Sequence, residues 1–216
     1  KFYPETIIDV GVAKGTKPLY EKYPKSYFLL IEPIKSYEFF LKKILKKYNG
    51  SYCLAAASKD KGEVSFNIHP MHMDGSSLLK EEIGFKADGY EIKVPTIKID
   101  DLVKDKELKK PFLIKVDVQG AELDVLRGAE ITLQATEVII LEVSLFKFMK
   151  GAPDFYEVIT FMKDHGFVTY DILRGCYRPL DKALGQVDIL FVKEDGIFRG
   201  DHRFGTPDQL KKIGIL

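Results

Sequence analysis

Residues 6–15 read Thr6-Ile-Ile-Asp-Val-Gly-Val-Ala-Lys-Gly15, so a run of strand-forming residues passes directly into a turn with two glycines. The apolar run predicts a buried strand over residues 6–10. Glycine at positions 11 and 15 lets the backbone turn tightly and approach a ligand closely. A helix is expected near residues 17–22, and strand, glycine turn and helix together are the unit from which open α/β sheets are built.

Strand-like and helix-like segments alternate outward from this unit, which predicts an α/β fold with a mostly parallel, doubly wound sheet. Further strands are expected at 27–31, 52–57, 63–68, 92–99, 112–117 and 138–143, and helices at 37–48, 123–129 and 155–162. Residues 167–173 and 187–192 read as two strands whose connection is too short for a crossover helix. The sheet is therefore expected to end in an antiparallel hairpin, while residues 69–90 read as a loop over the site.

The length of 216 residues suits a single domain over residues 1–216. A polar tail from about residue 194 to 216 is expected to pack on this domain or to mediate association, which leaves a homo-oligomer open. The abrupt start suggests a domain cut from a longer protein, and no secretory signal opens the chain. The longest apolar run, residues 138–146, is interrupted by Glu142 and is too short to span a bilayer.

The net charge limits the kinds of binding partner that we expect, and the cysteine content indicates the redox compartment. Basic and acidic residues number 33 and 32, a net charge of +1, which argues against nucleic acid and anionic membranes and favours a small or neutral acceptor. Cys53 and Cys176 form no Cys-x-x-Cys pair, so a reduced, cytoplasmic protein is expected.

The first candidate site is the turn Asp9-Val-Gly-Val-Ala-Lys-Gly15, because ligands of open α/β sheets bind beyond the carboxyl ends of the strands. It lacks the Gly-x-Gly-x-x-Gly of pyrophosphate binding, which disfavours NAD. Glu32 follows about 20 residues on, at the end of the second strand, where an acid can accept both hydroxyls of an adenosine ribose. The alternative for residues 9–15 is a tight strand-to-helix turn that binds no ligand. The alternative for Glu32 is a solvated surface charge.

The second candidate site is Lys115-Val-Asp-Val-Gln-Gly-Ala-Glu122, which follows a central strand. Asp117 or Glu122 is expected to position or deprotonate an acceptor group, and His69 and His72 are the next candidates for this role. The alternative is helix capping by Asp117 and compensation of the helix dipole by Glu122.

His69, His72 and Asp74 lie in the loop before these residues, and their spacing matches no familiar metal site, so no metal is expected. Ser76 and Ser77 are candidate contacts to cofactor or substrate.

An ordered set of motifs resembles the FkbM family of methyltransferases and covers most of the chain. The Asp-Val-Gln-Gly-Ala-Glu stretch is its most specific part. The set comprises Ile8-Asp-Val-Gly11 with Gly15, Ile31-Glu-Pro33, Ala55-Ala-Ala-Ser58, Thr96-Ile-Lys-Ile-Asp100, Lys115-Val-Asp-Val-Gln-Gly-Ala-Glu122, Val125-Leu-Arg-Gly-Ala129 and Leu141-Glu142.

The resemblance implies a Rossmann-like class I methyltransferase fold with S-adenosylmethionine as cofactor. Glu32 would hold the ribose, Ala56 would lie near the adenine and Asp117 near the methyl-bearing end. The cofactor loop would be formed by Asp9, Gly11, Ala13 and Gly15. One departure is Val12-Ala-Lys14, where the family commonly has Ala-Asn, which removes a polar group near the amino-acid end of the cofactor.

The implied reaction is O-methylation of a hydroxyl on a sugar, a glycan or a secondary metabolite, and a nitrogen acceptor also stays open. One alternative is an oxidoreductase that uses NAD or a nucleotide sugar on a similar sheet. A second is a degenerate domain that binds partners without catalysis. Binding of S-adenosylmethionine, of NAD or of neither separates the three.

Overall fold

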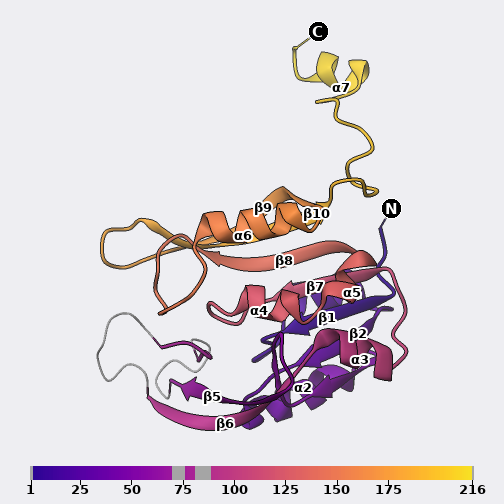
Figure 1. Ribbon diagram of the computed structural model, residues 1–216. Helices are drawn as coiled ribbons and strands as arrows, with labels where there is room; N and C mark the ends of the chain where they lie inside the picture. The colour runs from indigo at the N-terminus through magenta and orange to yellow at the C-terminus, as the bar shows by residue number, and fades with distance from the viewer. Residues whose placement is uncertain (1, 70–75, 81–88, 216) are drawn as a thin grey trace.

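The structure is a computed structural model, and it describes residues 2–69, 76–80 and 89–215 (Figure 1). Its centre is a seven-stranded sheet. The strands lie in the order β3 (Gly50–Cys53), β2 (Tyr27–Ile31), β1 (Thr6–Val10), β7 (Phe112–Val116), β8 (Thr136–Ser144), β10 (Leu184–Lys193) and β9 (Phe167–Tyr177). The pairs from β3 to β8 are parallel, whereas β10 is antiparallel to both neighbours. The expected sheet with its terminal hairpin is confirmed.

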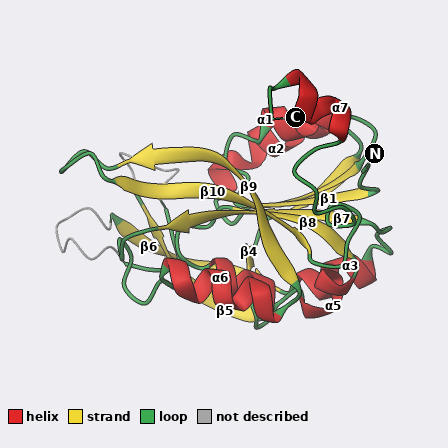
Figure 2. Ribbon diagram, turned by 90° about the horizontal axis from the view of Figure 1, so that it is seen from above, coloured by secondary structure: helices red, strands yellow, loops and turns green. Residues whose placement is uncertain are grey.

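Helices cover both faces of this sheet, as the doubly wound prediction requires (Figure 2). The helices that pack on the sheet are α1 (Lys17–Lys22), α2 (Glu38–Leu45), α3 (Ile99–Asp105), α4 (Glu122–Arg127), α5 (Glu130–Gln134) and α6 (Phe155–Asp164). The turn η1 (Lys35–Tyr37) precedes α2, and α7 (Pro207–Lys212) lies in the tail. Because side chains alternate along a strand, Ile8 packs in the cluster with α3 to α6 while Ile7 packs in the cluster with α1 and α2. Both side chains are fully buried, so β1 is the middle of a two-sided core.

The single strand expected over residues 52–57 is wrong. β3 ends at Cys53, and β4 (Ala56–Ala57) belongs to a second sheet, in which β6 (Tyr90–Ile97) lies between β4 and β5 (Gly62–Ile68). The last bond of the parallel ladder runs from the Glu32 amide to the Cys53 carbonyl, at 3.1 Å. Pro33 follows Glu32 and has no N–H that could bond to the segment after Cys53. That segment therefore leaves the edge of the large sheet.

Other boundaries move by a few residues. The helix expected over 37–48 ends at Leu45, and the hairpin strands extend to Tyr177 and from Leu184. The helix expected over 123–129 is interrupted between α4 and α5 at Gly128, where a Cβ would lie 2.1 Å from the Ser58 carbonyl oxygen.

The residues after β10 leave the sheet, and α7 stands away from it (Figure 1). Phe198 packs on Phe2 and Tyr170, at ring-centroid distances of 5.6 and 5.5 Å, whereas α7 buries none of its residues. None of the helices in the described part of the chain combines the length and the apolar character that a bilayer span requires.

Candidate functional site

An open cavity lies at the carboxyl ends of β1, β2 and β7; about 510 Å³ of empty space lies between its walls, a volume that includes open solvent. Parallel strands place the residues that follow them at one edge of a sheet, so sequence segments that are far apart meet there. The expected residues Gly11, Ala13, Glu32, Ala56 and Asp117 all line this cavity. The other lining residues are Val10, Ile31, Pro33, Ile34, Tyr37, Ala55, Ala57, Phe66, Ser76, Leu78 and Val118.

The turn after β1 is shaped by close backbone contact. Gly11 adopts φ +75°, and a Cβ on it would lie 1.8 Å from the Asp117 carbonyl oxygen. Only glycine therefore fits at position 11, where the backbone that follows β1 touches the backbone that follows β7. Gly15 also has a positive φ, but its neighbours are Ile44 and Tyr20, so it contributes to packing behind the turn. Asp9 and Gly15 are not among the cavity-lining residues.

Glu32 is buried at the cavity, with 3% of its surface exposed. Its Oε2 accepts the Ala13 amide at 2.8 Å and its Oε1 accepts the Ile34 amide at 2.9 Å. Burial raises the pKa of this carboxyl to about 7, although the two amides act in the opposite direction. Each carboxylate oxygen can accept more than one hydrogen bond, so both keep capacity for donors in the cavity.

Asp9 lies behind the turn and is fully buried. Its Oδ2 accepts the Tyr20 hydroxyl at 2.5 Å, and its Oδ1 lies 3.9 Å from Lys115 Nζ. Burial raises the pKa of Asp9, opposed by Lys115 and Tyr20. Asp9 thus ties the glycine turn to α1 and β7. Tyr20 carries no motif signal, and the sequence analysis missed it.

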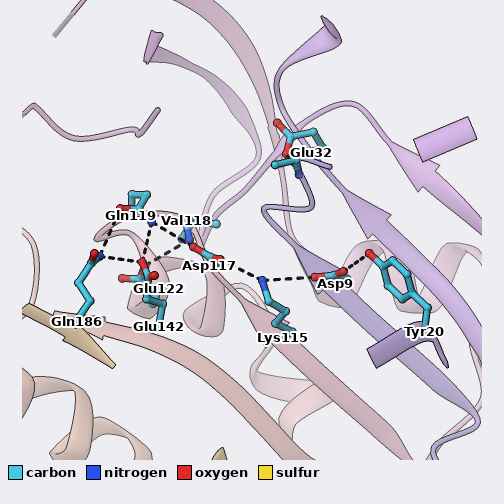
Figure 3. A network of polar contacts seen from close by, with 11 residues as sticks. Asp9, Tyr20, Glu32, Lys115, Asp117, Val118, Gln119, Glu122, Glu142 and Gln186 are labelled. Carbon is cyan, nitrogen blue, oxygen red and sulfur yellow. Dashed lines mark hydrogen bonds and ion pairs between the residues drawn. The ribbon is translucent and has the colours of Figure 1, made fainter. Parts of the chain in front are cut away.

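Lys115 joins Asp9 to the second site candidate (Figure 3). Its Nζ lies 3.2 Å from Asp117 Oδ2. Burial alone would lower the pKa of Lys115, but the Asp9 and Asp117 carboxylates outweigh it and raise that pKa. A permanent cation therefore stands beside the cavity-facing Asp117.

A group of carboxylate and amide side chains continues the network beyond Asp117, and Figure 3 shows Gln119, Glu142 and Gln186 pointing toward one another. Gln119 Nε2 donates to Asp117 Oδ1 at 3.2 Å and to Glu142 Oε2 at 2.7 Å. Gln186 Nε2 donates to the same Glu142 oxygen at 2.8 Å. Gln119 holds a left-handed φ of +56°, and its carbonyl accepts the Ser77 hydroxyl at 2.7 Å. Gln119 lies in the turn after β7, Glu142 on β8 and Gln186 on β10, so motif spacing gave no signal for the group.

Glu122, the second expected catalytic acid, is 5% exposed. Its Oε1 accepts the Gly120 amide at 2.9 Å and the Val118 amide at 3.4 Å. Burial raises its pKa to about 7, partly offset by the Gly120 amide. This carboxyl therefore holds the turn between β7 and α4.

The remaining candidates lie near the cavity. Ser76 Oγ accepts the His69 amide at 3.0 Å, and of these two residues Ser76 lines the cavity while His69 lies behind it at the end of β5. His72 and Asp74 lie outside the described residues. In the part of the chain that the structure describes, no three His, Cys, Asp or Glu side chains converge as metal ligands would.

Comparison with known proteins identifies relatives of this chain. Residues 9–169 match the family described as "Methyltransferase FkbM domain". Hexuronic acid methyltransferase AglP of Haloferax volcanii is 34% identical over 86 residues, which are 40% of this chain and 33% of that protein. Methyltransferase 1 of Beauveria bassiana is 26% identical over 144 residues, which are 57% of this chain and 58% of that protein. The chain thus matches about a third and somewhat over half of the length of these two relatives.

A solved structure shares the fold at low sequence identity. A chain of a fibrillarin/Nop5p complex aligns with a TM-score of 0.51 and 12% identity, over 88% of this chain and 72% of that chain. This likeness concerns the arrangement of the sheet and its helices.

Proposed function

The chain belongs to the FkbM family of methyltransferases, and we propose that it transfers the methyl group of S-adenosylmethionine to a hydroxyl group. Its sheet order is that of the Rossmann-like class I methyltransferase fold, which confirms the fold expected from the sequence. The cofactor, the acceptor and the residue roles below are parts of the proposal.

The residues at the cavity fit this cofactor. The observation that carries the proposal is the buried Glu32 carboxyl, because Glu32 lines the cavity and each of its two oxygens, which accepts one backbone amide, keeps acceptor capacity for a ribose hydroxyl. Ala55, Ala56 and Ala57 offer a small, apolar wall that suits an adenine ring. Gly11, which has no side chain, leaves room for the amino-acid end beside Asp117.

When bound, S-adenosylmethionine supplies an electrophilic methyl group, so the chain mainly has to align the acceptor. Alignment of reacting groups is worth up to roughly 7–11 kcal/mol in favourable cases. Asp117 lies where the methyl-bearing end would be, and Lys115 Nζ, 3.2 Å from Asp117 Oδ2, holds that carboxyl in place. Glu122 acts as a positioning residue, since its carboxyl is engaged by the Gly120 and Val118 amides.

A sugar or glycan hydroxyl is the acceptor we favour, because one relative is named a hexuronic acid methyltransferase. An NAD-dependent oxidoreductase on this sheet is disfavoured because the turn after β1 lacks a third glycine. Cys53 and Cys176 are both unpaired, which fits work in the reducing cytoplasm.

Titration calorimetry with S-adenosylmethionine, S-adenosylhomocysteine and NAD tests the cofactor. We expect micromolar binding of the first two and none of NAD. Glu32→Ala should abolish that binding, while Glu63→Ala, an exposed position on β5, should leave it unchanged. Binding of NAD alone would support the oxidoreductase, and binding of none of the three would support a domain without catalysis.

A further inference from the structure

We propose that Glu142, positioned by the side-chain amides of Gln119 and Gln186, is the general base that accepts the proton of a neutral acceptor hydroxyl. This inference rests on the function proposed above, and it assigns the acceptor end of the site to β8 and β10.

The hydrogen bonds place Glu142 next to the cavity wall. Gln119 Nε2 bridges Asp117 Oδ1, at 3.2 Å, and Glu142 Oε2, at 2.7 Å, so one amide group separates the two carboxyls. Gln186 Nε2 donates to the same oxygen at 2.8 Å. Both amides use Oε2, and the described residues donate no hydrogen bond to Oε1. Glu142 is therefore fixed by one oxygen and keeps the other for a proton.

The two other acids near the methyl-bearing end are engaged elsewhere. Asp117 Oδ2 lies 3.2 Å from Lys115 Nζ, and Asp117 Oδ1 accepts Gln119 Nε2 at 3.2 Å, so both oxygens of this carboxyl already have partners. Glu122 also uses a single oxygen, Oε1, for two backbone amides of its own turn, but it is only 5% exposed, whereas Glu142 is partly exposed and therefore open to an acceptor. Glu142 has no such cation beside it among the described residues, and its polar partners are neutral amides.

The surroundings of Glu142 make it a stronger base than an ordinary glutamate. Burial, followed by the Asp117, Asp188 and Glu122 carboxyls, raises the pKa of Glu142 to about 8, and the Gln119 amide opposes this. These three acids face it from the end of β7, from β10 and from α4. Two of these acids have a cation beside them: Lys115 Nζ lies 3.2 Å from Asp117 Oδ2, and Arg174 is the register partner of Asp188 on β9. A base whose pKa lies near the working pH is the most effective one.

The same charges select the acceptor. An anionic group placed beside Glu142, Asp117 and Asp188 would be repelled, whereas a neutral hydroxyl can donate its proton to the carboxylate. Two aromatic rings, Phe146 and Phe148, follow β8 at this edge with their centroids 5.8 Å apart. The Arg178 guanidinium, which is paired with Asp181, lies 3.8 Å from the Phe146 centroid and covers one face of that ring, so the opposite face and the Phe148 ring are what a sugar could contact. Ring faces provide apolar contact area for the C–H groups of a sugar. The acceptor class is therefore a sugar that carries no negative charge near the reacting hydroxyl, unlike the hexuronic acid in the name of one relative.

The step balances without a further reactant. The acceptor oxygen forms a bond to the methyl carbon as the bond from that carbon to sulfur breaks, and the electron pair of the broken bond stays on sulfur. The hydroxyl proton passes to Glu142, and it leaves to solvent after the product.

The test uses the full chain, radiolabelled S-adenosylmethionine and a panel of methyl glucoside, methyl galactoside, methyl mannoside and glucuronic acid, from pH 6 to 9.5. In the wild type, transfer to a neutral glycoside should rise about tenfold per pH unit and level off above about pH 8. Glu142→Gln should lower transfer by roughly 10²–10⁴-fold and flatten this rise. Its affinity for S-adenosylhomocysteine should stay within about twofold, because Glu142 does not line the cofactor cavity.

Two further variants control for folding. Glu137→Gln makes the same change at the other end of β8 and should keep the wild-type profile. Gln186→Leu removes one of the two amide donors that position Glu142, so the rise should move to higher pH and the plateau should fall, but by less than in Glu142→Gln. A plateau without that shift would contradict the assignment even if Glu142→Gln failed to fold.

The outcomes separate this inference from the function on which it rests. The inference is overturned if Glu142→Gln binds the cofactor and keeps more than about a tenth of the activity. Transfer by the wild type only to the carboxylate of glucuronic acid, or to no member of the panel, also overturns it. Failure of the wild type to bind S-adenosylmethionine overturns the proposed function as well.

Discussion

The two ends of the site are built by different means. At β1 and β2, Glu32 is held by the backbone amides of Ala13 and Ile34, which lie 19 and 2 residues away in sequence. At β7, β8 and β10, Glu142 is held by the side chains of Gln119 and Gln186, which lie 23 and 44 residues away. The first end depends on the shape of the backbone, and the second depends on which side chains neighbouring strands bring together.

This difference predicts that one end of the site binds the cofactor and the other end binds the acceptor. A backbone-built end tolerates few substitutions and suits a cofactor that never changes. An end built from side chains can be altered by substitution without moving the sheet, so it suits an acceptor that differs between relatives. Substitutions at the first end should act on cofactor affinity, and those at the second should act on transfer.

The largest effect is expected from Gly11→Ala. The added methyl group would lie 1.8 Å from the Asp117 carbonyl oxygen, so the turn has to move, and the left-handed φ adds about 1–2 kcal/mol of strain. We expect a loss of at least roughly 100-fold in affinity for S-adenosylmethionine, measured by calorimetry.

Gly166→Ala is the matched control for this variant. Gly166 has a φ of +77°, and a Cβ there would meet no atom within 4 Å, so the change brings the strain without the overlap. It should lower the melting temperature and leave affinity unchanged. Equal affinities for the two variants would show that the turn does not touch the cofactor.

Glu32→Gln is expected to have the next largest effect. The amide cannot accept hydrogen bonds at both of its terminal atoms, and it lacks the charge that strengthens bonds to ribose hydroxyls. A loss of about 1.5–3 kcal/mol, or roughly 10- to 150-fold in the dissociation constant, is expected by calorimetry. An unchanged constant, with Glu63→Gln as the control, would remove Glu32 from the cofactor site.

The pH dependence of cofactor affinity is a second test of the contact between Glu32 and the cofactor. The pKa of Glu32 is about 7 in the free protein, and hydroxyl donors favour the charged form, so binding should release a proton. Affinity for the cofactor should therefore increase with pH, by about tenfold between pH 6 and pH 8, because the Glu32 carboxyl loses its proton in this range. Calorimetry in two buffers of different ionisation enthalpy measures the proton release, which Glu32→Gln should abolish. An affinity that is flat across this range would contradict the role of Glu32.

The smallest effect is expected from Glu122→Gln. The amide oxygen can still accept the Gly120 amide, so transfer should change by less than about threefold. The pKa of Glu122 is raised to about 7, so the folded protein loses stability as the pH rises from about 4.5 to 7, and the amide removes this loss. Thermal melts at pH 5 and pH 8 should therefore differ less in the variant. A loss of transfer as large as that of Glu142→Gln would make Glu122 the base.

The contrast between the two ends also explains what the sequence could predict. The turn from Asp9 to Gly15 and Glu32 stand in local patterns that strand ends and glycine impose, so their place at the carboxyl edge could be read directly. The break after Cys53 depends on hydrogen bonds between strands, and Pro33 was its only local sign. Gln119, Glu142 and Gln186 meet only through the pairing of β8 with β7 and β10, which no spacing along the chain reveals.

A crystal structure of the complex with S-adenosylhomocysteine tests the central claim most directly, namely that the cofactor lies at the backbone-built end and the acceptor at the other. The account predicts both ribose hydroxyls within hydrogen-bond distance of the Glu32 carboxylate, the adenine against Ala56, and the sulfur beside Asp117 on the side of Glu142. A ligand bound elsewhere, or a ribose held by another carboxylate, would contradict it.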